Sequence, residues 1–244
     1  MSRLARSSLL PAAFLLALLA GGALAQGEGQ TARDPLWWTH SVWGWIQASG
    51  VIGMVIVAQS VLVGAIVIEQ AATIRREKLA PPDLLEELDA LLEEKAVREA
   101  LELCAVRPCF LANAVAAGLA KVGHPYETIE KAAADAGEAE AIRLHQRVGW
   151  LSLHANIAPM LGLLGTVQGM IGAFNVIAAK RGQANPADFA ADIAVALLTT
   201  LFGLLVAIPV MAVFAQMRNR VTRLSIEVGD LAVDLLERYR GGKA

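Results

Sequence analysis

The 244-residue chain has few charged residues and few of the side chains that hold metals. Charged residues make up 18% of it and the formal net charge is −2, whereas about a quarter is usual for a soluble domain. This balance gives no case for a nucleic-acid partner. The two cysteines and four histidines show no spacing that a zinc or redox site requires. We therefore expect no metal, no cofactor and, without a nucleophile paired to a base, no enzyme.

Long apolar runs dominate the sequence instead. Hydrophobic residues account for 56% of the chain, and its mean hydropathy is +0.51. Three runs, 42–68, 151–179 and 190–214, exceed the roughly 20 apolar residues that cross a bilayer. The sequence predicts an all-α integral membrane protein with three transmembrane helices.

The N-terminus has the features of a secretory signal. Arg3 and Arg6 precede a short apolar stretch, and Ala23-Leu24-Ala25 offers the small residues of a cleavage site. We expect a cleaved signal peptide over 1–25, followed by a periplasmic segment over 26–41. An uncleaved anchor is the alternative, although about a dozen apolar residues are short for a span.

Basic residues predict the orientation of the spans. One side carries Arg75, Arg76 and Lys78 after the first span, Arg143 and Arg147 before the second, and Arg218, Arg220 and Arg223 after the third. The other side has only Arg33 and Lys180-Arg181. Because lysine and arginine concentrate in cytoplasmic loops, the segments 69–150 and 215–244 should be cytoplasmic and the loop 180–189 periplasmic.

The cytoplasmic segment should be helical. A helix start at Pro81-Pro82-Asp83 is followed by leucines on one face. The run from Tyr126 to Trp150 has few helix breakers, so the second span should extend into the cytoplasm as one long helix. Cys104 and Cys109 fall on the reducing side, where buried thiols are expected rather than a disulfide.

The C-terminal helix carries an apolar seam with steps of three and four residues: Val221, Leu224, Val228, Leu231 and Leu235. The pattern covers about two heptads. It fits packing within the subunit as well as a coiled coil between subunits.

Four glycines share one face of the second span: Gly162, Gly165, Gly169 and Gly172. A glycine face in a membrane helix indicates close approach of another helix. We expect it to be a packing surface, with Thr166 beside it, and leucine at Gly165 or Gly169 to dissociate an oligomer.

The third span repeats this chemistry, because its small and polar residues Asp192, Ala196, Thr199, Thr200, Gly203 and Ala207 share an arc of roughly 100°. The two faces could line one path. Alternatively, the threonines bond back to carbonyls of their own helix or hold helices together. Pro159 and Pro209 should bend the two helices and free a carbonyl in each.

Two strings carry a family resemblance: APMLGLLGTVQGMI from Ala158 to Ile171, and IAVALLTTLFGLLVAIP from Ile193 to Pro209. They resemble the signature pair of the MotA/TolQ/ExbB proton-channel family, and the three-span layout is similar to ExbB and TolQ. The resemblance implies a bacterial inner-membrane subunit that forms a ring, typically a pentamer, around an ExbD/TolR-like single-span protein. Together they would convert the proton motive force into work at the outer membrane, with a TonB-like protein as a further partner. It also maps the pore threonines onto Thr166 and Thr200.

The sequence departs from the family pattern at Val195, where ExbB and TolQ commonly have a glutamate. Asp192 is a substitute on the Thr199/Gly203 face, or else it is merely solvated at the periplasmic mouth or stabilises the helix N-terminus. A sodium-driven homologue and a scaffold without ion conduction remain alternatives. A solute transporter would show repeated halves or a polar cavity, and three spans with so few charges indicate neither.

Overall fold

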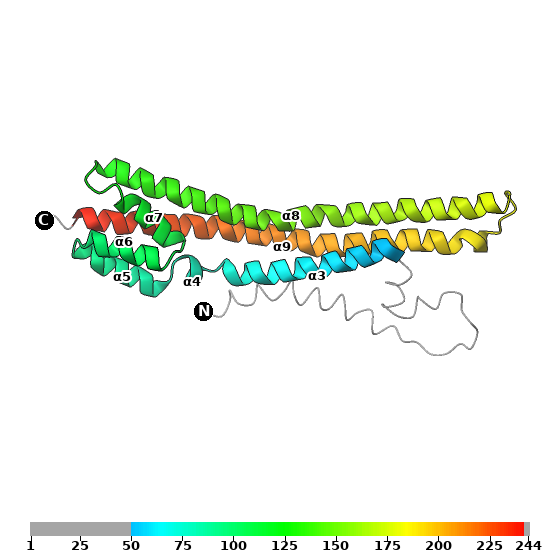
Figure 1. The fold of residues 1–244 in the computed structure, drawn as a ribbon, viewed down its shortest axis with the longest axis horizontal. Helices are drawn as coiled ribbons and strands as arrows, with labels where there is room; N and C mark the ends of the chain where they lie inside the picture. The colour runs from blue at the N-terminus through cyan, green and yellow to red at the C-terminus, as the bar shows by residue number, and fades with distance from the viewer. Residues whose placement is uncertain (1–49, 242–244) are drawn as a thin grey trace. The chain divides into compact units, whose positions relative to one another are not determined.

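The computed structural model describes residues 50–241, and all the secondary-structure elements among them that span several residues are α-helices. The sole β feature in this range is an isolated bridge between Val122 and His124. The helices are α3 (Gly50–Thr73), α4 (Arg76–Leu79), α5 (Pro82–Glu93), α6 (Val97–Val106), α7 (Phe110–Leu119), α8 (Tyr126–Ala179) and α9 (Pro186–Gly241) (Figure 1). The expected signal peptide, the periplasmic segment and the first residues of span one lie outside the described residues.

Three of these helices, α3, α8 and α9, are long and apolar enough to cross a membrane. The all-helical class and the three apolar helices predicted from the sequence are therefore confirmed. The described chain divides into a membrane unit, residues 50–68 and 150–214, and a second unit, residues 69–149 and 215–241.

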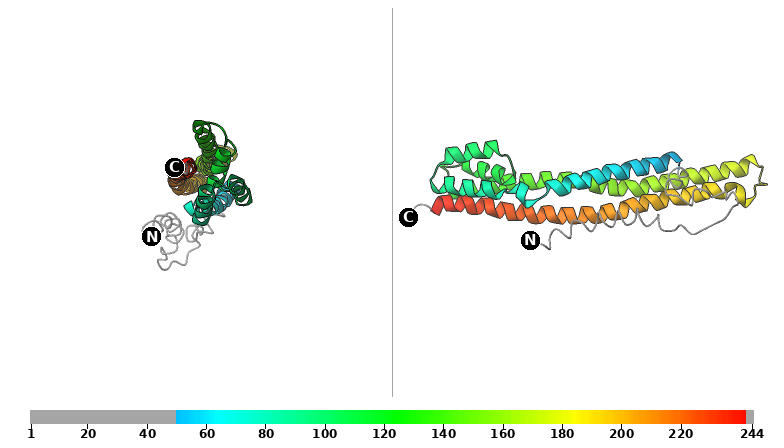
Figure 2. Two further views of the ribbon diagram at one scale, coloured as in Figure 1. Left: turned by 90° about the vertical axis from the view of Figure 1, so that its left-hand side faces the viewer. Right: turned by 90° about the horizontal axis from the view of Figure 1, so that it is seen from below.

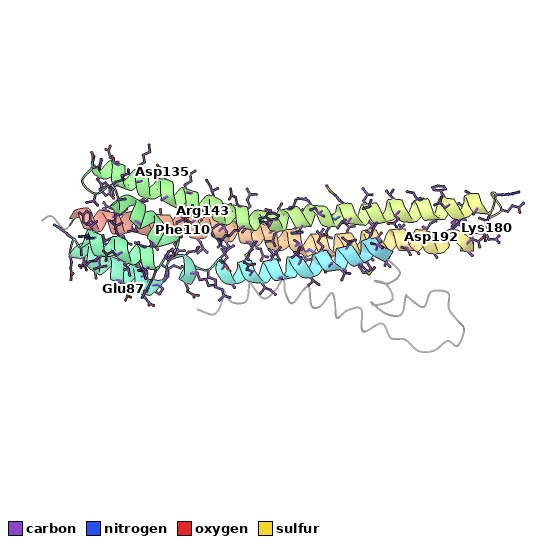
Figure 3. All side chains as sticks on the ribbon, viewed as in Figure 1. Glu87, Phe110, Asp135, Arg143, Lys180 and Asp192 are labelled. Atoms are coloured by element: carbon purple, nitrogen blue, oxygen red, sulfur yellow. The ribbon has the colours of Figure 1, made fainter. Side chains whose placement is uncertain are left out.

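In the membrane unit, α8 and α9 form an antiparallel hairpin whose arms lie side by side in both Figure 1 and Figure 2. Residues 180–185 connect them, and Arg181 and Gly182 take positive φ values of 50° and 81°. Glycine adopts such a value without strain, which allows the chain to reverse here. Lys180 Nζ lies 2.6 Å from Asp188 Oδ1 across the turn. Lys180 is labelled at this turn in Figure 3.

The second unit has its own apolar core. Pro82 begins α5, as predicted, and Leu84, Leu88 and Leu92 of that helix are buried. The seam of α9 is buried within the same chain at Val221, Val228 and Leu235. This burial supports packing within the subunit over a coiled coil between subunits.

Both long helices continue through the residues that divide the units. The 54 residues of α8 join the segment from Tyr126 to the second span, which confirms the predicted continuity. The 56 residues of α9 join the third span and the C-terminal segment, which the sequence analysis had treated as separate elements. Pro159 and Pro209 lie inside these helices; the bends expected at them stay a prediction.

The two cysteines are free thiols. Cys109 Sγ accepts a hydrogen bond of 3.4 Å from Ala112 N and so caps the start of α7. Burial and the nearby Cys109 raise the pKa of Cys104 to about 11. Cys109 is half-buried, and burial raises its pKa as well. Both thiols therefore stay protonated, and unreactive, at neutral pH.

Candidate functional site: the hairpin of α8 and α9

The glycine face of α8 packs directly on α9. A Cβ atom added at Gly162 would lie 3.0 Å from Thr200 Cα, and one at Gly169 would lie 2.6 Å from Ala196 Cβ. From the other side, a Cβ atom at Gly203 would lie 2.7 Å from the carbonyl oxygen of Ala158. Because real Cβ contacts below 3.0 Å are essentially never seen, Gly169 and Gly203 admit only glycine without a shift of the helices, and at Gly162 the neighbour would have to give by a few tenths of an ångström.

The helix that lies against the glycine face in the structure is α9 of the same chain. Leucine at Gly165 or Gly169 would therefore disturb the hairpin itself. The expected loss of an oligomer on the same substitutions stays a prediction.

The close approach brings two hydroxyl groups together. Thr166 Oγ1 of α8 and Thr200 Oγ1 of α9 are in direct hydrogen-bonding contact. Thr166 Oγ1 also lies 3.2 Å from the carbonyl oxygens of Gly162 and Ala196, and Thr200 Oγ1 lies 3.1 Å from that of Gly162. The pair therefore bridges the two helices within the half-buried centre of the hairpin.

The two hydroxyl groups make four hydrogen-bonding contacts but carry only two protons, so not all four contacts can be hydrogen bonds at the same time. Each hydroxyl has one proton to donate and two lone pairs that accept. If Thr166 donates to Thr200, then Thr200 donates to Gly162 O. In the opposite order, Thr200 donates to Thr166, which donates to a carbonyl of either helix. The pair can thus take two hydrogen-bond directions without moving a heavy atom.

Thr199, predicted with this pair, has a different environment. Its side chain is 1% exposed and fits against Gly165. Its hydroxyl donates to Ala196 O of its own helix at 2.8 Å. This arrangement matches the alternative in which a membrane threonine bonds back to its helix.

Asp192 lies over Gly172, toward the turn end of the hairpin (Figure 3). A Cβ atom at Gly172 would be 3.4 Å from both Cγ and Oδ2 of Asp192, so the carboxyl group faces α8. Within residues 50–241 the carboxylate meets no hydrogen-bonding or ion-pair partner. An ionisable group in a span is a functional candidate by default, and its side chain here is half-buried.

A further polar contact, which the sequence analysis missed, joins α3 to α8. Gln59 Nε2 donates to the carbonyl oxygen of His154 at 3.0 Å. Gln59 is only 8% exposed. The two residues lie 95 positions apart in the sequence, and Gln59 is one of two glutamines in the predicted first span, so no sequence signal singled out this contact.

The described residues offer no metal centre. No group of three or more histidine, cysteine, aspartate or glutamate side chains within 50–241 could hold an ion. The chemistry of the hairpin therefore rests on hydroxyl groups, backbone carbonyls and one unpartnered carboxylate.

Three helices long and apolar enough to cross a membrane, two of them packed through glycines, place the chain in the class of all-helical membrane proteins. The chain belongs to the MotA/TolQ/ExbB proton channel family, whose model matches residues 104–229, just over half of its length. The matched range includes the glycine face, both threonines and Asp192.

Individual relatives agree with this assignment. The chain is 47% identical over 62 residues to the biopolymer transport protein exbB1 of Vibrio cholerae, covering 25% of this chain and 27% of that protein. It is 35% identical over 104 residues to the Tol-Pal system protein TolQ of Haemophilus influenzae, covering 41% and 45%. The chain thus spans less than half the length of these relatives.

A solved structure described as C. jejuni MotAB has a similar fold, with a TM-score of 0.51 over 97% of this chain and 88% of that chain. The sequence identity is 18%, so this similarity shows the fold alone.

Proposed function

We propose that the chain is the ion-conducting subunit of a bacterial inner-membrane complex that couples the proton motive force to work at the outer membrane. The observation that carries the proposal is the Thr166–Thr200 hydroxyl pair, which bridges α8 and α9. Asp192, a carboxylate without a partner among the described residues, lies nearer the turn of the same hairpin. The names of the relatives, a biopolymer transport protein and TolQ, support the same class. In this proposal the protein is not an enzyme.

The roles are divided between this chain and a partner. An ExbD/TolR-like helix would bring the carboxylate that gains and loses a proton, and a ring of this chain, five copies by family resemblance, would surround it. The hydroxyl pair would support proton movement by donating in either direction. Asp192 would supply the acidic group on the periplasmic side that other members place at the position of Val195.

Proton uptake into vesicles that contain the chain and its partner tests the proposal. Uptake should require both proteins and an applied membrane potential, and Asp192→Asn should reduce it by about a hundredfold, the lower end of the range for losing a proton-transfer group. Asp188→Asn is the matched control, because Asp188 lies one turn earlier on α9 and pairs with Lys180 at the turn. Replacing the proton gradient by a sodium gradient distinguishes the sodium-driven alternative.

A scaffold without conduction is the second candidate. It is favoured by the bonding of the hydroxyls of Thr166, Thr199 and Thr200 to backbone carbonyls, the arrangement of residues that only hold helices together. Normal assembly with the partner but no uptake above that of empty vesicles would replace the proposed function by this one.

A further inference from the structure

We propose that His154 is a proton-relay residue on the cytoplasmic half of the membrane unit, with Gln59 as the group that receives its N–H. The inference rests on the proposed function, and it adds a site that neither the resemblance nor the hydroxyl pair requires.

Two buried atoms without partners carry the proposal. His154 Nδ1 and Gln59 Oε1 are both inaccessible to solvent, and neither has a hydrogen-bond partner among residues 50–241. Their residues are already joined, because Gln59 Nε2 donates to His154 O at 3.0 Å. A buried polar atom without a partner costs about 1–3 kcal/mol, so the described residues leave this contact incomplete.

The chemistry of the two atoms is complementary. Gln59 Oε1 can only accept a hydrogen bond, and Nδ1 of a neutral histidine with its proton on Nε2 can only accept as well. A proton added to Nδ1 turns that atom into a donor, and in this proposal Gln59 Oε1 is its acceptor. Protonation thus supplies the donor that both atoms lack.

The position of His154 along α8 suits a relay. It stands twelve residues from Thr166, or about 18 Å along the helix. By the predicted topology it lies on the cytoplasmic side of the hydroxyl pair. Histidine is also the side chain that ordinarily exchanges a proton near neutral pH.

Apart from the turn end of the hairpin, the described residues of the membrane unit contain no titratable side chain other than His154. Residues 50–68 of α3 contain no titratable group, and neither do residues 193–214 of α9. On α8, His154 is the one titratable side chain among residues 150–179. The remaining charged residues described in this unit, Lys180, Arg181, Asp188 and Asp192, belong to the turn end of the hairpin.

The relay step moves one proton and consumes nothing. A proton that leaves the partner carboxylate by way of the hydroxyl pair and intervening water binds His154 Nδ1. The Nδ1–H bond forms and its hydrogen bond to Gln59 Oε1 holds the charge. The proton then leaves to cytoplasmic water, and Nδ1 returns to its neutral state.

The test compares His154→Gln with His145→Gln in vesicles that contain the partner. His145 lies nine residues earlier on α8, in the other unit, and matches the change in chemistry. H154Q should lower the rate of proton uptake about a hundredfold, the lower end of the range for removing a proton-transfer group. It should also abolish the dependence of that rate on internal pH. H145Q should change neither.

A second variant separates a relay from a packing role. Gln59→Leu removes the acceptor but leaves the imidazole, so it should reduce uptake while the dependence on internal pH persists. Native mass spectrometry and thermal unfolding of each variant show whether assembly and stability are retained.

The outcomes are distinct. If the wild-type complex takes up protons and H154Q matches it at every internal pH, the relay is overturned and the proposed function stands. If H154Q loses uptake only together with assembly, His154 has a packing role and the relay is likewise overturned. If the wild-type complex takes up no protons, the proposed function fails and the relay fails with it.

Discussion

The side chain of Thr199 occupies the space that any residue larger than glycine would need at position 165. A Cβ atom at Gly165 would lie 2.6 Å from Thr199 Cβ, and Thr199 is 1% exposed. The small residue on α8 and the β-branched residue on α9 therefore interlock. This contact makes the hairpin a tightly packed pair in a medium where burying apolar surface gives helices little reason to associate.

Gly165→Ala should consequently destabilise the hairpin. Overpacking of a tight contact costs about 1–3 kcal/mol, and Thr199 cannot move without disturbing its bond to Ala196 O. Gly64→Ala is the matched control, since nothing lies within 4 Å of a Cβ atom at Gly64 of α3. Thermal unfolding in detergent should show a lower midpoint for the first variant alone. Equal midpoints would contradict the interlock.

The hydroxyl pair makes a separate prediction. Thr166→Val and Thr200→Val keep nearly the same volume but remove the bridge, and each should cost about 1 kcal/mol for the lost hydrogen bonds. Both variants should assemble with the partner and lose proton uptake. Thr166→Ser and Thr200→Ser should retain most of the uptake, because the hydroxyl remains. Wild-type uptake in both valine variants would remove the pair from the ion path.

Topology can be tested independently of conduction. A reporter that is active only in the cytoplasm should work when fused after Lys78, and one active only in the periplasm should work in the turn between Ala184 and Pro186. The reason is the excess of arginine and lysine on one side of all three spans. The opposite pattern of activity would reverse the orientation and reject the assignment of Asp192 to the periplasmic half.

Alkylation of Cys104 should be slow and strongly dependent on pH. With its pKa raised to about 11 from 9.0, its thiolate fraction at pH 8 is about a hundredfold below that of the unfolded chain. The raised pKa also means that the folded state keeps a proton which the unfolded state releases, so stability should fall as pH rises above about 9. Mass spectrometry after N-ethylmaleimide treatment, with and without urea, measures the ratio of rates. Equal rates would contradict the burial of this thiol.

The elements of the fold were predictable because they depend on local patterns. Runs of apolar residues predicted the spans, and Pro82 predicted the start of α5. The spacing of glycines predicted a packing face on α8. It could not predict that α9 of the same chain covers that face, because spacing along one helix carries no information on its partner.

The candidate site was predictable only in part, for a related reason. Thr166 and Thr200 were named from resemblance, but their direct contact depends on the register between α8 and α9. The contact of Gln59 with His154 depends on the placement of a third helix, which no periodicity reveals. The capping of α7 by Cys109 was also missed, since sulfur is an uncommon cap beside serine, threonine, aspartate and asparagine.

The connection of residues 180–185 has a consequence for how the membrane unit can move. A turn this short, closed by Lys180 and Asp188, leaves little slack for one arm of the hairpin to slide along the other. A slip of one helical turn would carry Thr199 from Gly165 to Gly162 or Gly169, so the glycine face itself does not block such a slip. The short turn is therefore the feature that limits sliding between α8 and α9, and we expect the hairpin to move as one body.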